Sequence, residues 1–204
     1  MLMKPKSVYT ILLFCSLFST FGSFQFSYSQ DVKNQSEYFF DDISVAILSP
    51  EHVYHLNLSK QKIDSLNIDF SIFVNLKYLN LGKNKLRYLP RSIEFLINLD
   101  TLILDKNKFE HFPTQICSLK KIKYLSINNN ELEEIPDCIG NLVKLEYLDL
   151  YANELGFFSN EIAKLKALQT LDLRVITISD EDKERIKKLL PNTKVYFSRG
   201  CNCD

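Results

Sequence analysis

The chain has 204 residues, of which 46% are hydrophobic and 25% are charged, proportions that are typical of one globular domain. Its 25 basic and 25 acidic side chains cancel to a formal net charge of zero. It therefore lacks the basic excess with which nucleic-acid-binding proteins neutralise phosphates. The same balance of charge gives no support for polybasic binding to a membrane surface. Only 5 glycines are present, too far apart for a glycine-rich phosphate loop. We expect neither a nucleic-acid partner nor a cofactor.

The first segment, residues 1–29, has the pattern of a secretory signal peptide. Two lysines precede an apolar stretch at residues 8–18, and a Ser-Tyr-Ser run then places cleavage before Gln30. Cleavage after Gly22 is the alternative. The apolar stretch is shorter than the ~20 residues that cross a bilayer, so an uncleaved anchor is disfavoured. The segment predicts export to an extracellular, periplasmic or cell-surface location, with membrane contact only before cleavage.

The next segment, residues 30–52, reads as an N-terminal flank. Residues 42–48 predict a short helix, and Ser49-Pro50 stops it because the residue before a proline disfavours helical backbone.

Residues 53–173 contain an internal repeat of 23 residues without insertion or deletion. Repeat positions 1, 4, 6 and 11 are apolar in every row, and positions 14, 18 and 21 are apolar in every complete row. Because one row cannot bury its apolar edge alone, such rows stack into a solenoid. The six rows, the last of them incomplete, start at Val53, Leu76, Leu99, Ile122, Leu145 and Leu168.

Each part of the row predicts a local structure. Positions 3 to 7 alternate between outward and inward side chains, which indicates a strand with one buried face. Prolines at position 15 suit a return segment that needs no ladder hydrogen bonds. Position 9 is asparagine in the middle rows, and its stacked side chains can satisfy the backbone amides of the turn. This predicted structural ladder consists of Asn84, Asn107, Asn130 and Asn153, with Gln61 at the same position of the first row.

The pattern LxxLxLxxNxLxxLPxxIxxLxx resembles the typical 23-residue class of the leucine-rich-repeat family, and the resemblance covers residues 53–173. It implies an α/β fold, a right-handed leucine-rich-repeat solenoid. A parallel sheet would lie on the concave side and short helical or 3-10 turns on the convex side.

Residues 174–197 predict a C-terminal cap. The ladder position becomes Ile176, and Ser179 followed by Asp182 resembles a capping box that starts a helix over residues 180–190. Residues 194–197 read as a final edge strand, and residues 198–204 form a Cys-containing tail. With a helical cap at both ends, as in secreted bacterial leucine-rich-repeat proteins, we expect a complete domain.

The outward strand positions are the main candidates for function, since the inward ones are explained by burial. Strands stack about 4.8 Å apart, so these positions form one continuous concave surface. Tyrosine there buries a large area and keeps a polar group, which suits an interface. The predicted partner-binding residues are Tyr78, Asn80, Ile103, Asp105, Tyr124, Ser126, Tyr147, Asp149 and Tyr151.

A rim of charge flanks the asparagine column and forms a second candidate surface. It changes sign to Glu131 and Glu154 in later rows, and such a gradient can orient a dipolar partner. A solvated rim that only keeps the protein soluble is the favoured interpretation. Its basic part comprises Lys60, Lys62, Lys83, Lys85, Lys106 and Lys108.

The histidines and cysteines give no catalytic or metal-binding pattern. No histidine has a carboxylate or thiol at a recognisable metal or triad spacing. Cys117 and Cys138 lie in adjacent rows on opposite sides of their inward isoleucines, so we expect diverging side chains and no bridge. For Cys201 and Cys203, a short disulfide, a soft-metal tail, an intermolecular link and a tail without a role all remain open.

These observations predict a non-enzymatic, exported protein-protein interaction module, a monomer or weak dimer that binds through its concave face. A glycan-binding or cell-envelope structural protein is the alternative, and saturable binding of a purified polysaccharide would distinguish it. Two sequons, Asn34-Gln35-Ser36 and Asn57-Leu58-Ser59, carry glycans only in a eukaryotic source.

Overall fold

The structure, a computed structural model, describes residues 39–198. The predicted signal peptide, most of the N-terminal flank and the cysteines of the tail lie outside these residues.

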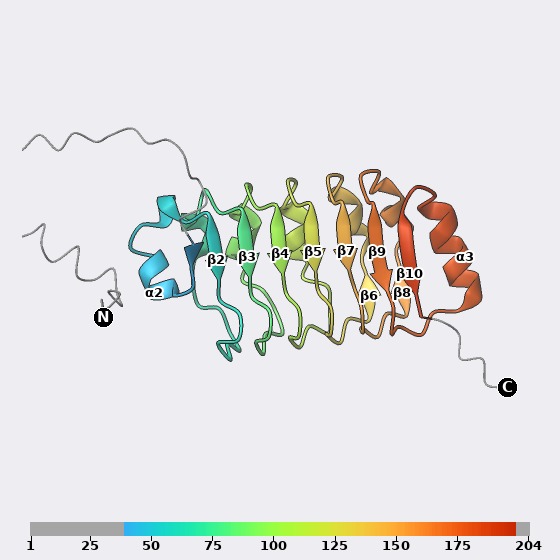
Figure 1. The fold of residues 1–204 in the computed structure, drawn as a ribbon, viewed down its shortest axis with the longest axis horizontal. Helices are drawn as coiled ribbons and strands as arrows, with labels where there is room; N and C mark the ends of the chain where they lie inside the picture. Colours follow the sequence, from blue (N-terminus) through green and yellow to red (C-terminus); the bar gives the residue numbers. More distant parts are fainter. Residues whose placement is uncertain (1–38, 199–204) are drawn as a thin grey trace, which may run out of the picture. The chain divides into compact units, whose positions relative to one another are not determined.

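Eight short strands of residues 39–198 form one parallel sheet in the order β1-β2-β3-β4-β5-β7-β9-β10, and the 3-10 turns lie behind it (Figure 1). From β2 to β9, each strand residue pairs with the residue 23 positions away, so Leu79 lies between Leu56 and Leu102. The alternation predicts this register, because a slip by one residue would expose every leucine. The strands are β1 Phe39–Phe40, β2 His55–Asn57, β3 Tyr78–Asn80, β4 Thr101–Ile103, β5 Tyr124–Ser126, β7 Tyr147–Asp149, β9 Thr170–Leu173 and β10 Lys194–Phe197.

The strands are shorter than the five predicted positions because the chain turns sharply after position 7. Position 8 adopts positive φ in every row, for example 58° at Lys83, 54° at Lys106 and 60° at Val175. This left-handed conformation strains side chains other than glycine, asparagine and aspartate, most of all a β-branched one. The pattern of apolar residues does not encode this turn.

Short 3-10 helices return the chain behind the sheet, as predicted. Three of them follow Pro90, Pro113 and Pro136, whose φ angles of −67°, −67° and −77° suit the entry to a helix. Two further strands, β6 Glu134–Ile135 and β8 Phe157–Phe158, pair beside these turns and were not predicted. The 3-10 helices are η1 Pro50–His52, η2 Phe70–Ile72, η3 Arg91–Phe95, η4 Thr114–Ser118, η5 Asp137–Asn141 and η6 Asn160–Lys164.

The asparagine column forms a buried ladder between the strands and the return segments. Asn107 is 8% exposed and donates to the carbonyl oxygens of Leu81 at 3.0 Å and Leu104 at 2.9 Å. Its Oδ1 accepts from the backbone N–H of Leu86 at 3.0 Å. Asn84, Asn130 and Asn153 repeat the arrangement. Gln61 does not join the ladder, because its exposed side chain reaches the carbonyl oxygen of Asp41 instead.

Helices lie next to both ends of the repeat. Helix α2 spans Ile43–Ala46, shorter than predicted, and the Asp42 side chain accepts the N–H of Ser44 at 2.8 Å. Helix α3 spans Asp180–Leu189, and the Ser179 hydroxyl caps it by accepting the N–H of Asp182. Strand β10 pairs with β9 over residues 194–197, as the sequence predicts. Among residues 39–198, no helix combines the length and apolar character needed to span a membrane.

The expectation that Cys117 and Cys138 stay unbridged is wrong. Their side chains form a disulfide, and their Cα atoms lie 5.6 Å apart, inside the usual range. In a 3-10 helix the two neighbours of an inward residue point along the solenoid in opposite directions. The residue after Ile116 therefore faces the next row, and the residue before Ile139 faces back. Gly140 meets the next row in the same way: an added Cβ would lie 2.9 Å from the Glu161 carbonyl oxygen.

Candidate functional site

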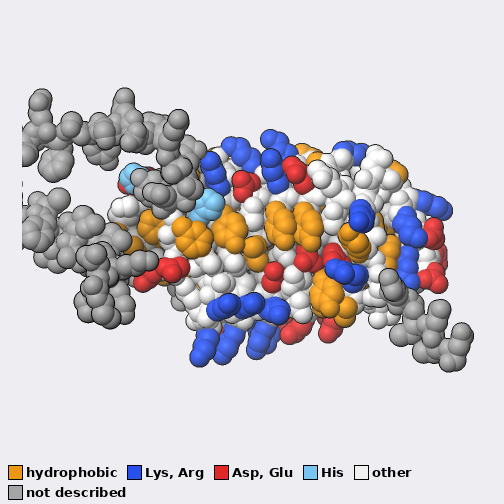
Figure 2. All heavy atoms as spheres, in the orientation of Figure 1, with side chains coloured by type: hydrophobic (Ala, Val, Ile, Leu, Met, Phe, Trp, Pro, Cys, Tyr) orange, Lys and Arg blue, Asp and Glu red, His pale blue; other side chains and the backbone are white. Residues whose placement is uncertain are grey.

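Aromatic rings line the outward face of the parallel sheet, called here the sheet face, and correspond to the predicted concave surface. We call the rings at the first strand position the aromatic row. Figure 2 shows hydrophobic side chains along the middle of this face. The rings of Tyr124 and Tyr147 stack with centroids 4.6 Å apart and an interplanar angle of 1°, and those of His55 and Tyr78 stack at 5.7 Å. The row comprises Phe39, His55, Tyr78, Tyr124 and Tyr147.

The aromatic row is interrupted once between its ends. Strand β4 carries Thr101 at this position, and its strand neighbours in the sheet are Tyr78 and Tyr124. Thr101 is half-buried, and Ile103 lies two residues along the same strand, also half-buried. Thr101 occupies an outward strand position and is not among the residues predicted to bind a partner.

The environment of the tyrosines disfavours their ionised form. Burial raises the pKa of Tyr124 to about 12, and the nearby Tyr147 hydroxyl and the Asp149 and Asp105 carboxylates add to the effect. Burial likewise raises the pKa of Tyr147. Both hydroxyls therefore remain neutral hydrogen-bond donors near neutral pH.

The outward residues of the third strand position are less available than predicted. Ser126 is 1% exposed and Asp149 is 9% exposed. In four rows the side chain at this position accepts the N–H two residues further on, as Asp149 Oδ1 does from Tyr151 at 3.0 Å. Asn57, Asn80 and Asp172 make the same contact with Ser59, Gly82 and Arg174. Of the residues that the sequence assigns to partner binding, Asn80 and Asp149 thus also hold the backbone after their strands, whereas the Ser126 hydroxyl hydrogen-bonds to Asp105.

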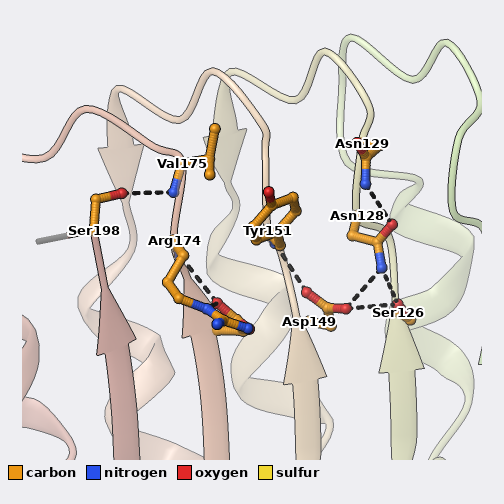
Figure 3. Close-up of polar contacts among 9 residues, drawn as sticks. Ser126, Asn128, Asn129, Asp149, Tyr151, Arg174, Val175 and Ser198 are labelled. Atoms are coloured by element: carbon orange, nitrogen blue, oxygen red, sulfur yellow. Dashed lines mark hydrogen bonds and ion pairs between the residues drawn. The ribbon is translucent and has the colours of Figure 1, made fainter.

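Two carboxylates on the sheet face share one serine hydroxyl. Ser126 Oγ lies 2.5 Å from Asp105 Oδ1. It also lies 3.3 Å from Asp149 Oδ2, to which Asn128 Nδ2 donates at 2.7 Å (Figure 3). Asp105 also accepts the backbone N–H of Asn128 at 3.1 Å, and Ser126, the residue at the third strand position of that row, instead donates its hydroxyl to Asp105. Burial raises the pKa of Asp105, against the effect of these hydrogen bonds, and Asp149 raises it further. Within residues 39–198 neither Asp105 nor Asp149 forms an ion pair.

An arginine lies between two tyrosine rings at the C-terminal end of the face. The Arg174 guanidinium carbon is 5.7 Å from the centroid of Tyr151 and 5.5 Å from that of Tyr196. Its Nε and Nη2 donate to both carboxylate oxygens of Asp172, at 3.0 Å and 2.6 Å (Figure 3). The repeat pattern does not predict this cluster, because Tyr196 comes from the last strand, outside the repeat.

The predicted lysine rim lies along one edge of the face. All its lysines are exposed, and within the described part of the chain none of them forms an ion pair. Basic side chains gather on this edge over the N-terminal strands, and acidic ones follow further along it (Figure 2). The described histidines are separated: His55 lies in the aromatic row and His111 lines a depression of ≈ 390 Å³ with Tyr88. No group of three or more metal-ligating side chains within residues 39–198 is placed to hold a metal ion.

Comparison with known proteins identifies the family. The sequence profile described as "Leucine-rich repeat region" matches residues 52–193, whereas no curated protein matches the sequence. A leucine-rich-repeat protein of Leptospira interrogans is 36% identical with a TM-score of 0.67, and the match covers 80% of this chain and 42% of that one. Internalin C2 of Listeria monocytogenes is 25% identical with a TM-score of 0.58, covering 72% of this chain and 62% of that one.

A more distant match has the same fold. The plant peptide hormone receptor RGFR1, solved in complex with RGF2, is 22% identical with a TM-score of 0.52, covering 63% of this chain and 21% of that one. This chain thus spans less than two thirds of each of these three proteins. The profile match extends over most of the repeat, and the parallel sheet with its asparagine ladder agrees with it. The chain belongs to the leucine-rich-repeat family.

Proposed function

We propose that this protein is an exported module that binds a partner protein through its sheet face. The observation that carries the proposal is the aromatic row together with Tyr151, a set of large side chains on one side of a rigid sheet that the fold leaves half-buried or, at Phe39, exposed. Aromatic residues on a rigid surface lose little entropy on binding and bury large areas, which favours them at interface centres. The proposal includes no catalytic step.

The stacking of the rings favours a protein over a glycan as the partner. Tyr124 and Tyr147 stack face to face, so each ring covers one face of the other. A sugar packs its C–H groups on the negatively polarised face of a ring, whereas hydroxyls and ring edges suit the mixed surface of a protein. The RGFR1 receptor, which shares the fold, is solved with RGF2 bound.

The export part of the proposal rests on two features. Residues 1–29 have the signal-peptide pattern, and the Cys117–Cys138 disulfide suits an oxidising compartment, because cytosolic thiols are kept reduced. The mass of the protein recovered outside the cytoplasm tests it. A chain that begins at Gln30 supports export, and a full-length chain confined to the cytoplasm contradicts it.

A capture experiment tests the binding face. Immobilised protein is compared with a Tyr124→Ser, Tyr147→Ser, Tyr151→Ser variant, using material from the source organism and its surroundings. The matched control replaces exposed aromatic side chains of the opposite side, Tyr88→Ser and Phe157→Ser, which are 64% and 55% exposed. All variants must unfold at comparable temperatures.

The expected result is a protein retained by the original chain and by the control variant but lost by the triple variant. Equal retention by all three contradicts the proposal and moves the site to the lysine rim or the 3-10 side. Retention of purified polysaccharide through the same tyrosines, with no protein retained, identifies the glycan-binding alternative.

A further inference from the structure

The interruption of the aromatic row at Thr101 is shaped to receive one planar side chain. Neighbouring parallel strands lie about 4.8 Å apart, so Tyr78 and Tyr124, two strands apart, are separated by about 9.6 Å. Elsewhere in the row, adjacent rings stack at 4.6 Å and 5.7 Å. A planar group centred over Thr101 would therefore contact a ring on each side at the spacing that the row already uses.

The charges around this gap favour a cation. Asp105 follows strand β4 in the same repeat row, four residues after Thr101, and its carboxylate forms no ion pair within residues 39–198. The negative charges of Asp149 and Asp105 both act on the Tyr124 hydroxyl and raise its pKa. Tyrosine faces attract cations through the negative potential of the ring.

The protein itself contains the arrangement that would fill the gap. At the C-terminal end of the same face, the Arg174 guanidinium lies between the rings of Tyr151 and Tyr196 and pairs with the Asp172 carboxylate. Guanidinium is planar, remains charged, and stacks on aromatic rings better than an ammonium group. The gap at Thr101 has a tyrosine on each neighbouring strand and the Asp105 carboxylate four residues further along its row, but it has no arginine of its own.

We propose that the gap between Tyr78 and Tyr124 over Thr101 is a socket for an arginine side chain of the partner protein. The proposal rests on the proposed function, since it names the group that the sheet face recognises. The guanidinium stacks between the two tyrosines and is attracted by Asp105. The lysine rim lies on the turns at one edge and contributes no group to the socket.

Three short peptides and two matched variants test the socket. The probe is acetyl-Gly-Arg-Gly-amide, titrated into the protein while backbone amide signals are followed by NMR. Peptides with citrulline, which keeps the planar shape without the charge, and with lysine, which keeps the charge without the plane, are the ligand controls. Thr101→Tyr fills the gap with a ring, and Thr170→Tyr places the same ring elsewhere on the sheet face.

The expected result is a set of shifts centred on Thr101, Tyr78 and Tyr124 with the arginine peptide. Affinity falls by about tenfold or more with the citrulline peptide or in the Thr101→Tyr protein, because a partly desolvated cation–π contact is lost. Affinity for the arginine peptide stays unchanged in Thr170→Tyr. Asp105→Asn weakens arginine binding and reduces its salt dependence. Equal binding of arginine and citrulline, or binding unaffected by Thr101→Tyr, overturns the socket.

Stability gives a readout that needs no ligand. Thr101→Tyr would stack between two rings, whereas Thr170→Tyr has one tyrosine neighbour, Tyr147, in the row. The first should therefore raise the melting temperature more than the second. A lower melting temperature for Thr101→Tyr than for Thr170→Tyr means that the gap does not fit a planar group.

The captured partner separates the two proposals. If the triple tyrosine variant loses the partner while Thr101→Tyr keeps it, the sheet face binds but the arginine socket is wrong. If both lose it and Thr170→Tyr keeps it, both proposals stand. If neither variant loses it, the proposed function itself fails.

Discussion

Replacing Asn107 with alanine should destabilise the fold through one buried amide in particular. The N–H of Leu86, a fully buried residue, has Asn107 Oδ1 as its acceptor. An orphaned buried N–H costs about 1–3 kcal/mol. The carbonyl oxygens of Leu81 and Leu104 lose a donor too, but each keeps a second one from the neighbouring ladder asparagine. Their loss adds about 1 kcal/mol, so the free energy of unfolding should fall by about 2–4 kcal/mol.

Urea unfolding measures this change, with Gln61→Ala as the matched control. Gln61 occupies the same repeat position, but its side chain is exposed and makes one hydrogen bond, to the Asp41 carbonyl oxygen, so its replacement should cost under about 0.5 kcal/mol. Hydrogen exchange at the Leu86 amide should accelerate in Asn107→Ala and remain slow in Gln61→Ala. If the two variants lose the same stability, or if the Leu86 amide stays protected, the orphaned-amide argument is refuted.

Three further predictions follow from other parts of the structure. Cys117→Ser with Cys138→Ser should lower the free energy of unfolding by roughly 3 kcal/mol, because the bridge closes a loop of sequence separation 21; a melting temperature unaffected by reductant would contradict this. Val175→Asn should stabilise by roughly 1 kcal/mol, since Val175 has an exposed β-branched side chain at φ 60°, and an unchanged urea midpoint would count against strain there. Burial raises the pKa of Asp105 above its ordinary 3.8, so its contribution to stability is full below that pH and is lost as the pH rises through the higher folded pKa. Asp105→Asn should remove that fall. The difference in urea midpoint between the variant and the original chain should therefore favour the variant more at pH 7 than at pH 3, and parallel pH profiles of the two proteins would refute the argument.

The sequence predicted those features that depend on one row at a time. The apolar positions predicted the register of the strands, and the asparagine column predicted hydrogen-bond partners for the backbone amides of the turns. Ser179 marked the start of the C-terminal helix. These follow from periodicity and local hydrogen bonding, which a single repeat already contains. The sequence also predicted the outward tyrosines of the repeat, Tyr78, Tyr124, Tyr147 and Tyr151, but its list of binding residues did not include His55, whose ring the structure places in the aromatic row.

Contacts between rows were decided only in the tertiary structure. The bridge between Cys117 and Cys138 depends on which way a 3-10 turn directs the neighbours of its inward residue, and sequence position does not give that direction. Asp149 became buried because its oxygens bind Tyr151, Asn128 and Ser126 from two rows. The Arg174 cluster and the gap at Thr101 arise because stacking brings residues about 23 positions apart to within one strand spacing of each other. The repeat determines that rows stack, and the identity of the side chains that meet across each step determines what the face can bind.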